Sequence, residues 1–255
     1  MRPLTKALAV VLAALIVVSA AALWQVDRFL NSAVNVPGEG ANFEIAPGTP
    51  FTRVSEGLAE QGIISNPTLL RIYARVSGRA GSVHAGEYFI EPGTTTAGLM
   101  NQFTSGDVLL YSFTIVEGWN QWELLRALHA HPQIDAQISE EDWPALLEEL
   151  GAETGHPEGL FLPETYRFPR NTSDRTVLKQ AYRLMQTVLS EEWPDRAADA
   201  PVASPYEALV LASIVEKETA RTDERNRIAG VFARRLEKRM RLQTDPTVIY
   251  GIGPG

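Results

Sequence analysis

The feature that most constrains this 255-residue chain is a run of about twenty residues without a charged side chain, from Ala7 to Val26. At 1.5 Å per residue a helix of this length spans about 30 Å, the thickness of the hydrocarbon core of a bilayer. Arg2 and Lys6 precede the run, and a positive flank on this side predicts a cytoplasmic N-terminus. We therefore expect residues 1–6 in the cytoplasm, residues 7–26 as a single transmembrane helix, and the remainder outside the cytoplasm.

A cleavable signal peptide is the alternative for this run, because the small residues 20–22 (Ala-Ala-Ala) offer a cleavage site. We favour the uncleaved anchor, which would be contradicted if the mature protein began at or near Leu23. Residues 27–42 then form a linker, whose second part is rich in Gly, Asn and Pro.

Composition excludes several classes of protein. The net charge is −8, so the basic surface that nucleic acid requires is not expected. Cysteine is absent, which rules out disulfides and thiolate metal sites. The four histidines lack the i, i+4 spacing of a helical zinc pair, and no glycine-rich phosphate loop occurs. We expect no metal and no cofactor.

A weak internal repeat follows the linker. Residues 43–49 (Phe-x-Ile-x-Pro-Gly-Thr) recur at 88–94 as Tyr-x-Ile-x-Pro-Gly-Thr. Each copy alternates apolar and polar residues, turns at Pro-Gly and enters a helical pattern. Between the copies we expect two helices, at 51–61 and from Asn66-Pro67 onward, and after the second copy a short helix ended by Gly106. The order over residues 43–91 is thus βααβ.

A second domain is expected after residue 106. Residues 111–116 have the composition of a strand, and Glu117-Gly118 form a turn. Apolar residues at helical spacing then predict helices at 120–130, 139–150, 176–189, 204–219 and 222–238. The fold class is α+β, with a transmembrane helix, a small βααβ module and a mixed, mainly helical domain.

The helix at 204–219 carries the most informative carboxylate. Ser204, Pro205 and Glu207 predict its start as a capping box with proline at the first position. Glu218 lies within about 20° of Leu211 around the helix axis, whereas Glu216 lies about 140° away. We expect Glu218 to continue the apolar face and Glu216 to face water.

Two interpretations of Glu218 remain open from the residues alone. A carboxyl group on an apolar face is desolvated, which favours the protonated form and suits a general acid. Alternatively, Glu218 forms a structural ion pair with Arg221, three residues further along the helix.

Two motifs resemble one family. Residues 212–219 (Ala-Ser-Ile-Val-Glu-Lys-Glu-Thr) are similar to the catalytic helix of lytic transglycosylases, in which Glu precedes Ser or Thr. Together with residues 241–251 (Arg-Leu-Gln-Thr-Asp-Pro-Thr-Val-Ile-Tyr-Gly), they resemble the endolytic murein transglycosylases, the YceG-like family. The resemblance covers the chain from the anchor to the last residue.

The resemblance implies a domain layout and a set of site residues. Residues 43–106 would be a LysM-like module, and 107–255 the YceG-like catalytic domain, incomplete at its C-terminus. Glu218 would be the catalytic residue. Residues 157–166 are similar to the family's Glu-Gly-x-x-x-Pro-Asp-Thr-Tyr stretch, with Glu164 in place of Asp. We expect substrate-binding side chains in this stretch and in residues 241–251: Glu164, Tyr166, Gln243, Asp245, Thr247 and Tyr250.

The implied activity is cleavage of nascent peptidoglycan strands without water. Glu218 would protonate the oxygen between N-acetylmuramic acid and N-acetylglucosamine, leaving 1,6-anhydro ends and terminating elongation. The resemblance implies the bacterial inner membrane as location, an extracytoplasmic domain, and peptidoglycan synthases as partners. A muramidase that uses water and a second carboxylate is one alternative, with Glu164 or Asp245 as candidates. A non-catalytic, membrane-anchored glycan-binding protein is the other.

Overall fold

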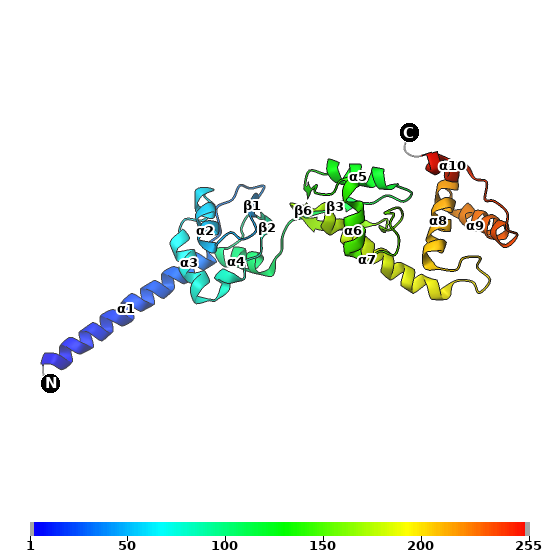
Figure 1. Cartoon of the computed structure of the whole chain (residues 1–255). Helices are drawn as coiled ribbons and strands as arrows, with labels where there is room; N and C mark the ends of the chain where they lie inside the picture. The colour runs from blue at the N-terminus through cyan, green and yellow to red at the C-terminus, as the bar shows by residue number, and fades with distance from the viewer. Residues whose placement is uncertain (1–2, 253–255) are drawn as a thin grey trace. The chain divides into compact units, whose positions relative to one another are not determined.

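The structure of the protein is a computed structural model that describes residues 3–252. The chain divides into two compact units, with the boundary in the sequence between Leu110 and Tyr111. The elements of the first unit are α1 (Pro3–Asn31), β1 (Ala41–Ile45), α2 (Phe51–Glu60), α3 (Pro67–Val76), the 3-10 helix η1 (Arg79–Gly81), β2 (Gly86–Ile90) and α4 (Thr96–Ser105). Figure 1 labels its α-helices and strands.

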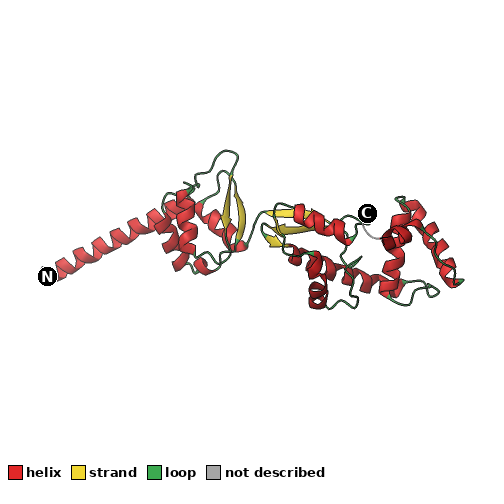
Figure 2. Ribbon diagram, turned by 45° about the horizontal axis from the view of Figure 1, so that its top comes forward, coloured by secondary structure: helices red, strands yellow, loops and turns green. Residues whose placement is uncertain are grey.

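The second unit contains short strands and most of the helices, as Figure 2 shows. Its elements are β3 (Leu110–Thr114), α5 (Gln121–Ala130), β4 (Ile134–Asp135), η2 (Glu140–Asp142), α6 (Trp143–Leu150), β5 (Thr165–Pro169), β6 (Thr172–Ser173), α7 (Asp174–Glu192), η3 (Trp193–Asp195), α8 (Pro205–Glu218), α9 (Thr222–Glu237) and α10 (Asp245–Ile252). Strand β3 pairs with β5, and β4 pairs with β6 in parallel.

Helix α1 is the predicted apolar helix. Its part from Val10 to Asn31 is long and apolar enough to cross a membrane, a property that a signal sequence near an N-terminus shares. Most of its apolar side chains are exposed, for example those of Ile16 and Trp24. The helix continues through Asp27 and Arg28, beyond the predicted span. Met1 and Arg2 lie outside the described residues.

The first unit confirms the predicted βααβ order. Strands β1 and β2 pair antiparallel, with Phe43 opposite Tyr88. Both Pro-Gly turns place glycine in the left-handed region, at Gly48 (φ +76°) and Gly93 (φ +87°), where a side chain would be strained. The matching turns explain why the two sequence copies share the Pro-Gly pair.

Helix α3 shows how local signals set the boundaries. The Asn66 side chain accepts a hydrogen bond from the Leu69 amide at 2.9 Å, and Pro67 occupies the first helical position. Leu70 is fully buried, whereas Val76, six residues further along the helix, is 83% exposed. The buried side runs instead through Ala74, one turn after Leu70.

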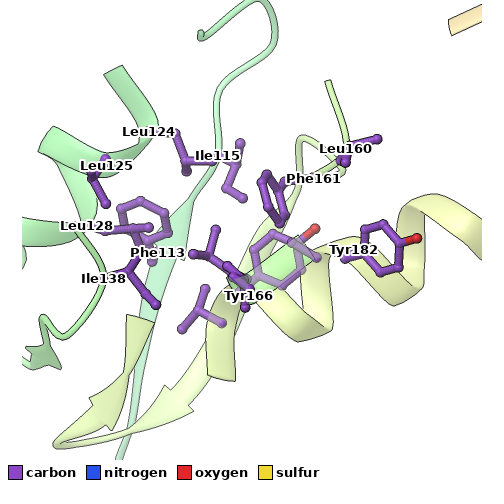
Figure 3. Packing of buried hydrophobic residues seen from close by; sticks show 14 of the residues in the cluster. Phe113, Ile115, Leu124, Leu125, Leu128, Ile138, Leu160, Phe161, Tyr166 and Tyr182 are labelled. Atoms are coloured by element: carbon purple, nitrogen blue, oxygen red, sulfur yellow. The ribbon is translucent and has the colours of Figure 1, made fainter. Parts of the chain in front are cut away.

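The core of the second unit lies between its strands, α5, α6 and α7 (Figure 3). Its buried side chains include Phe113, Ile115, Leu124, Leu128, Leu146, Phe161, Tyr166 and Leu178. A buried carboxylate joins two segments here: Asp174, the first residue of α7, accepts hydrogen bonds from the amides of Gln137 and Ile138, both at 2.9 Å. These bonds satisfy a charge that burial would otherwise make costly.

Two predicted elements differ from the structure. The helix expected at 139–150 begins as the 3-10 turn η2, and its α-helical part starts at Trp143. No helix was predicted for the segment 241–251, which has no regular secondary structure up to Thr244 and then forms helix α10. Asp245-Pro246 explains this helix start, because an acidic residue and proline favour the first turn.

Candidate active site

The second unit contains a cavity of about 920 Å³. Four segments provide most of its lining, namely residues 115–124, the turn at 156–163, helix α8 and helix α10, and Met185 of α7 adds to them. The lining includes several aromatic rings, among them Trp119, Trp122, His156, Tyr206 and Tyr250. Its charged members are Glu117, Glu158, Glu216 and Lys217. The cavity has the size and the mixed lining typical of small-molecule and oligosaccharide sites.

Helix α8 forms one wall, and its start is as the sequence predicts. Ser204 accepts a hydrogen bond from the Glu207 amide at 3.2 Å, and Pro205 is the first helical residue. In a capping box the carboxylate of Glu207 would accept from the amide of the cap residue, Ser204. Here it accepts instead from the amide of the preceding residue, Ala203, at 2.6 Å. The helix ends at Glu218, and Glu216 and Lys217 reach the cavity lining from its last turn.

Glu218 is exposed, which corrects the expectation that it would continue a buried face. Within α8 only Val215 is buried. The Glu218 carboxylate accepts a hydrogen bond from the hydroxyl of Thr244, a side chain that is 5% exposed. Glu218 is not among the residues that line the cavity, although its neighbour Lys217 is.

Glu216, which was expected to face water, is partly covered by protein. It is half-buried, lines the cavity and forms an ion pair with Arg225 of α9 at 2.8 Å. Helix α9 packs on α8 and covers this side, which helical periodicity alone could not indicate. Arg221, the expected partner of Glu218, instead bonds Asp223 at 2.8 Å.

The segment 241–251 brings two of its four predicted residues to the cavity. Thr247 and Tyr250 line it from α10, because they lie three residues apart on the same helix face. Gln243 and Asp245 are exposed and lie outside the lining. Gln243 adopts a left-handed backbone (φ +52°), which turns the chain into α10.

Tyr250 connects α10 to the turn at 156–163, which also lines the cavity. Its hydroxyl donates to the Glu158 carboxylate at 3.1 Å, and the same Glu158 oxygen accepts from the Gln121 amide, the first of helix α5, at 3.3 Å. Burial raises the pKa of Tyr250 to about 12, and the adjacent Glu158 charge adds to this rise. The phenol therefore stays a neutral donor throughout the physiological range.

The two predicted residues of the 157–166 stretch lie away from the cavity lining. Glu164 is exposed, and its carboxylate accepts from the Thr165 amide at 2.7 Å. Tyr166 is 2% exposed and donates its hydroxyl to the Leu162 carbonyl at 2.6 Å, within the core that Figure 3 shows. The structure thus supports a packing role for Tyr166, and its contact with substrate stays a prediction.

Sequence reasoning missed Glu158 and Glu216 as members of the cavity. Glu158 lies in the 157–166 motif, so the sequence did indicate that this stretch belongs to the site. Glu216, by contrast, was expected to face water. Trp119 and Trp122 also line the cavity. Trp119 also packs against the core, with its ring 6.5 Å from that of Phe113.

Within residues 3–252, no group of three or more His, Asp or Glu side chains is arranged to hold a metal ion. The acid–base groups of the cavity and of the end of α8 include carboxylates, one lysine and one histidine. Such a set can transfer protons, bind hydroxyl groups and pack against the faces of sugar rings.

Comparison with known proteins places this geometry in a family. The family model of YceG-like proteins matches residues 43–254, which include the cavity, helix α8 and the Thr244 segment. The chain belongs to the YceG-like family.

Three curated relatives of this YceG-like chain carry the name endolytic murein transglycosylase. The protein of Bacillus subtilis (strain 168) is 26% identical over 234 residues, which cover 83% of this chain and 63% of the relative. Two proteins of Streptococcus pneumoniae, from strains D39 and R6, are each 25% identical over 238 residues, 82% of this chain and 42% of theirs. The chain therefore spans about four to six tenths of the length of these relatives.

A solved structure is also similar to this YceG-like chain. It is the crystal structure of a yceG-like protein from Listeria monocytogenes, at 24% identity and a TM-score of 0.47, covering 86% of this chain and 77% of that one.

Proposed function

We propose that this protein is a membrane-anchored endolytic lytic transglycosylase of peptidoglycan. Its substrate is the bond between N-acetylmuramic acid and N-acetylglucosamine in nascent glycan strands, and its products carry 1,6-anhydro ends. The observation that carries the proposal is the carboxylate of Glu218, held by Thr244 at the end of the helix that forms one wall of the cavity. Membership of the YceG-like family and the names of the relatives support it.

The cavity supports a glycan as ligand. Sugar rings have apolar faces that pack against aromatic side chains, and hydroxyl edges that need hydrogen-bond partners. Trp122 and Tyr206 offer rings, while Glu158 and Thr247 offer polar atoms in the same lining. We assign the cavity to binding of the strand beside the bond that is cut. Of the predicted substrate-binding residues, Thr247 and Tyr250 are best placed, and Glu164, Tyr166, Gln243 and Asp245 remain candidates of lower rank.

The reaction needs one carboxyl group in two successive roles. Protonated Glu218 donates its proton to the glycosidic oxygen as the bond to the anomeric carbon breaks, and the sugar becomes oxocarbenium-like. The resulting carboxylate then takes the proton from the carbon-6 hydroxyl of the same N-acetylmuramic acid. That oxygen forms the new bond to the anomeric carbon, and Glu218 ends protonated as it began. The reaction therefore requires no second carboxylate, and no water molecule is consumed.

The other parts of the chain complete the proposal. Helix α1 would anchor the protein in the inner membrane with its N-terminus in the cytoplasm. Residues 43–106, with the βααβ order of β1, α2, α3 and β2, would act as a LysM-like module that binds glycan. The active site would then face strands as the peptidoglycan synthases extrude them, so cutting would end their elongation.

The proposal is tested by mass spectrometry of glycan strands digested with the protein. Anhydro ends are expected with the wild type, and Glu218→Gln should lower their rate of formation by about 10²-fold or more, because the proton donor is lost. Glu191→Gln, which neutralises an exposed carboxylate on α7, is the matched control and should cleave like the wild type.

Other outcomes identify the alternatives. Reducing ends in place of anhydro ends would mean a muramidase, for which Glu158 and Glu216 of the cavity join Glu164 and Asp245 as candidates for the second carboxylate. Binding of glycan without any cleavage would mean a glycan-binding protein. Cleavage by Glu218→Gln at the wild-type rate would remove Glu218 from its assigned role.

A further inference from the structure

We propose that Thr244 is the positioning residue of Glu218: its hydroxyl fixes one carboxylate oxygen and leaves the other for the glycosidic bond. This inference rests on the proposed function, because it assigns Thr244 a part in that reaction. Thr244 was not among the residues expected from the sequence to form the site.

The contact between Thr244 and Glu218 joins a buried donor to an exposed acceptor. Thr244 is 5% exposed, and its Oγ1 donates to Oε2 of Glu218. Glu218 is itself exposed at the last position of α8, where a glutamate side chain is otherwise free to change rotamer. The buried hydroxyl of Thr244 therefore restrains the carboxylate of Glu218, which packing within α8 does not restrain.

The backbone around Thr244 directs the hydroxyl away from its own helix. Thr244 precedes α10, a position at which a threonine side chain commonly accepts from an amide of the first turn. Here the amide and the hydroxyl of Thr247 instead donate to the Thr244 carbonyl, at 3.2 and 2.7 Å. The first-turn amide is thus bonded to backbone, and the Thr244 hydroxyl hydrogen goes to Glu218.

Helix α9 supports the segment that carries Thr244. One nitrogen of the Arg235 guanidinium, Nη1, donates to the carbonyls of Arg241 and Leu242 at 3.2 and 2.5 Å. Gln243 then takes the left-handed turn (φ +52°) that brings Thr244 against the end of α8. The position of the hydroxyl is consequently set by two helices and a defined turn.

The hydrogen bond is compatible with both steps of the proposed reaction. When Glu218 is protonated on one oxygen, the other is a carbonyl oxygen that accepts from Thr244. When Glu218 is a carboxylate, the same oxygen still accepts. One geometry therefore serves proton donation and proton return, and no side chain has to move between the steps. Preorganisation of this kind contributes through orientation and not through substrate binding.

The test is the rate of anhydro-end formation by Thr244→Val and Thr244→Ser, measured over a range of glycan concentrations. Valine has the shape of threonine but no hydroxyl, so kcat should fall by about 10- to 100-fold while KM stays within about two-fold. Serine keeps the hydroxyl and should restore most of kcat. Thr187→Val is the matched control, since the Thr187 hydroxyl bonds only a carbonyl of its own helix, and it should match the wild type.

Three results would overturn the inference. A Thr244→Val protein with wild-type kcat means that the contact does not position Glu218. Equal losses in Thr244→Val and Thr244→Ser mean a packing role only. Additive shifts of the urea midpoint in the single variants Thr244→Val and Glu218→Gln and in their double variant mean that the two side chains do not interact. With any of these three results, the proposed function would still stand provided that Glu218→Gln loses activity. A wild type that cleaves nothing would overturn both.

Discussion

At the scale of single residues, burial keeps several tyrosine hydroxyls neutral. Burial raises the pKa of Tyr88 and Tyr166 to about 12 each, and the nearby carboxylates of Asp107 and Glu164 add to this effect. Both hydroxyls donate to backbone carbonyls, that of Tyr88 to His84 at 2.7 Å and that of Tyr166 to Leu162 at 2.6 Å. Each unit therefore contains a phenol that can ionise only at a cost to the fold.

The pH dependence of stability follows from these shifts. Below pH 10 the phenol is neutral in both the folded and the unfolded state, so the stability is fully present. Between pH 10 and about 12 the unfolded chain releases the proton first, and the free energy of unfolding falls with rising pH. For Tyr166, which is 2% exposed, the loss approaches about 2–3 kcal/mol by pH 12.

We expect Tyr166→Phe to have a flatter stability profile than the wild type between pH 9 and pH 11. The measurement is the urea midpoint of the second unit at both pH values, followed by fluorescence. Below pH 10 the variant should be less stable by about 1 kcal/mol, because the Leu162 carbonyl loses its donor. Identical slopes for the variant and the wild type would contradict the assignment of Tyr166 as a buried phenol.

At the scale of elements, helix α9 ends in a strained version of a common motif. The Met240 amide donates to the Arg235 carbonyl at 2.8 Å, and the Arg239 amide donates to that of Leu236 at 2.9 Å. This pair of bonds is the Schellman motif, which usually has glycine in the left-handed position. Here that position is Arg239, with φ +54°. The motif matters for the site because the chain runs from it directly into the Thr244 segment.

We expect Arg239→Gly to raise the free energy of unfolding by about 1 kcal/mol, because it removes the steric cost of a Cβ in the left-handed region. Urea denaturation measures the change. Lys238→Gly is the matched control, since Lys238 has φ −83°, and glycine there should lower stability by about 0.5–1 kcal/mol. Equal effects of the two glycines would show that the backbone conformation of Arg239 does not limit stability.

At the scale of the whole molecule, the long apolar helix α1 bears on where the protein resides. Its apolar side chains between Val10 and Leu23 are exposed and are not buried by any other described part of the chain, so we expect a lipid or another apolar environment to cover them. An anchor and a cleaved signal sequence both satisfy this requirement. They differ in whether the two folded units remain attached to the membrane.

We expect the protein to stay in the membrane fraction after washing with high salt or alkaline carbonate, with its N-terminus intact. A variant that lacks residues 2–31 should be released by the same wash. N-terminal sequencing of the mature protein checks the alternative, because cleavage of a signal peptide would leave a chain that begins at or near Leu23.

Local signals predicted much of the fold. The helix starts at Asn66, Asn120 and Ser204 follow from side chains that accept from amides a few residues ahead. The Pro-Gly turns follow from the φ that glycine permits, and the apolar length of α1 follows from counting residues. Each of these interactions is confined to one stretch of chain, so the sequence contains all of its partners.

The site depended on contacts between distant segments, which periodicity does not contain. The sequence by itself determined that α8 exists, where it begins and that it ends in a pair of carboxylates. Only the tertiary structure decided that Glu216 is covered by Arg225 of α9, that Glu218 is exposed, and that Thr244 holds it. The physical reason is that burial depends on which element packs against a helix face, and that partner can lie anywhere along the chain.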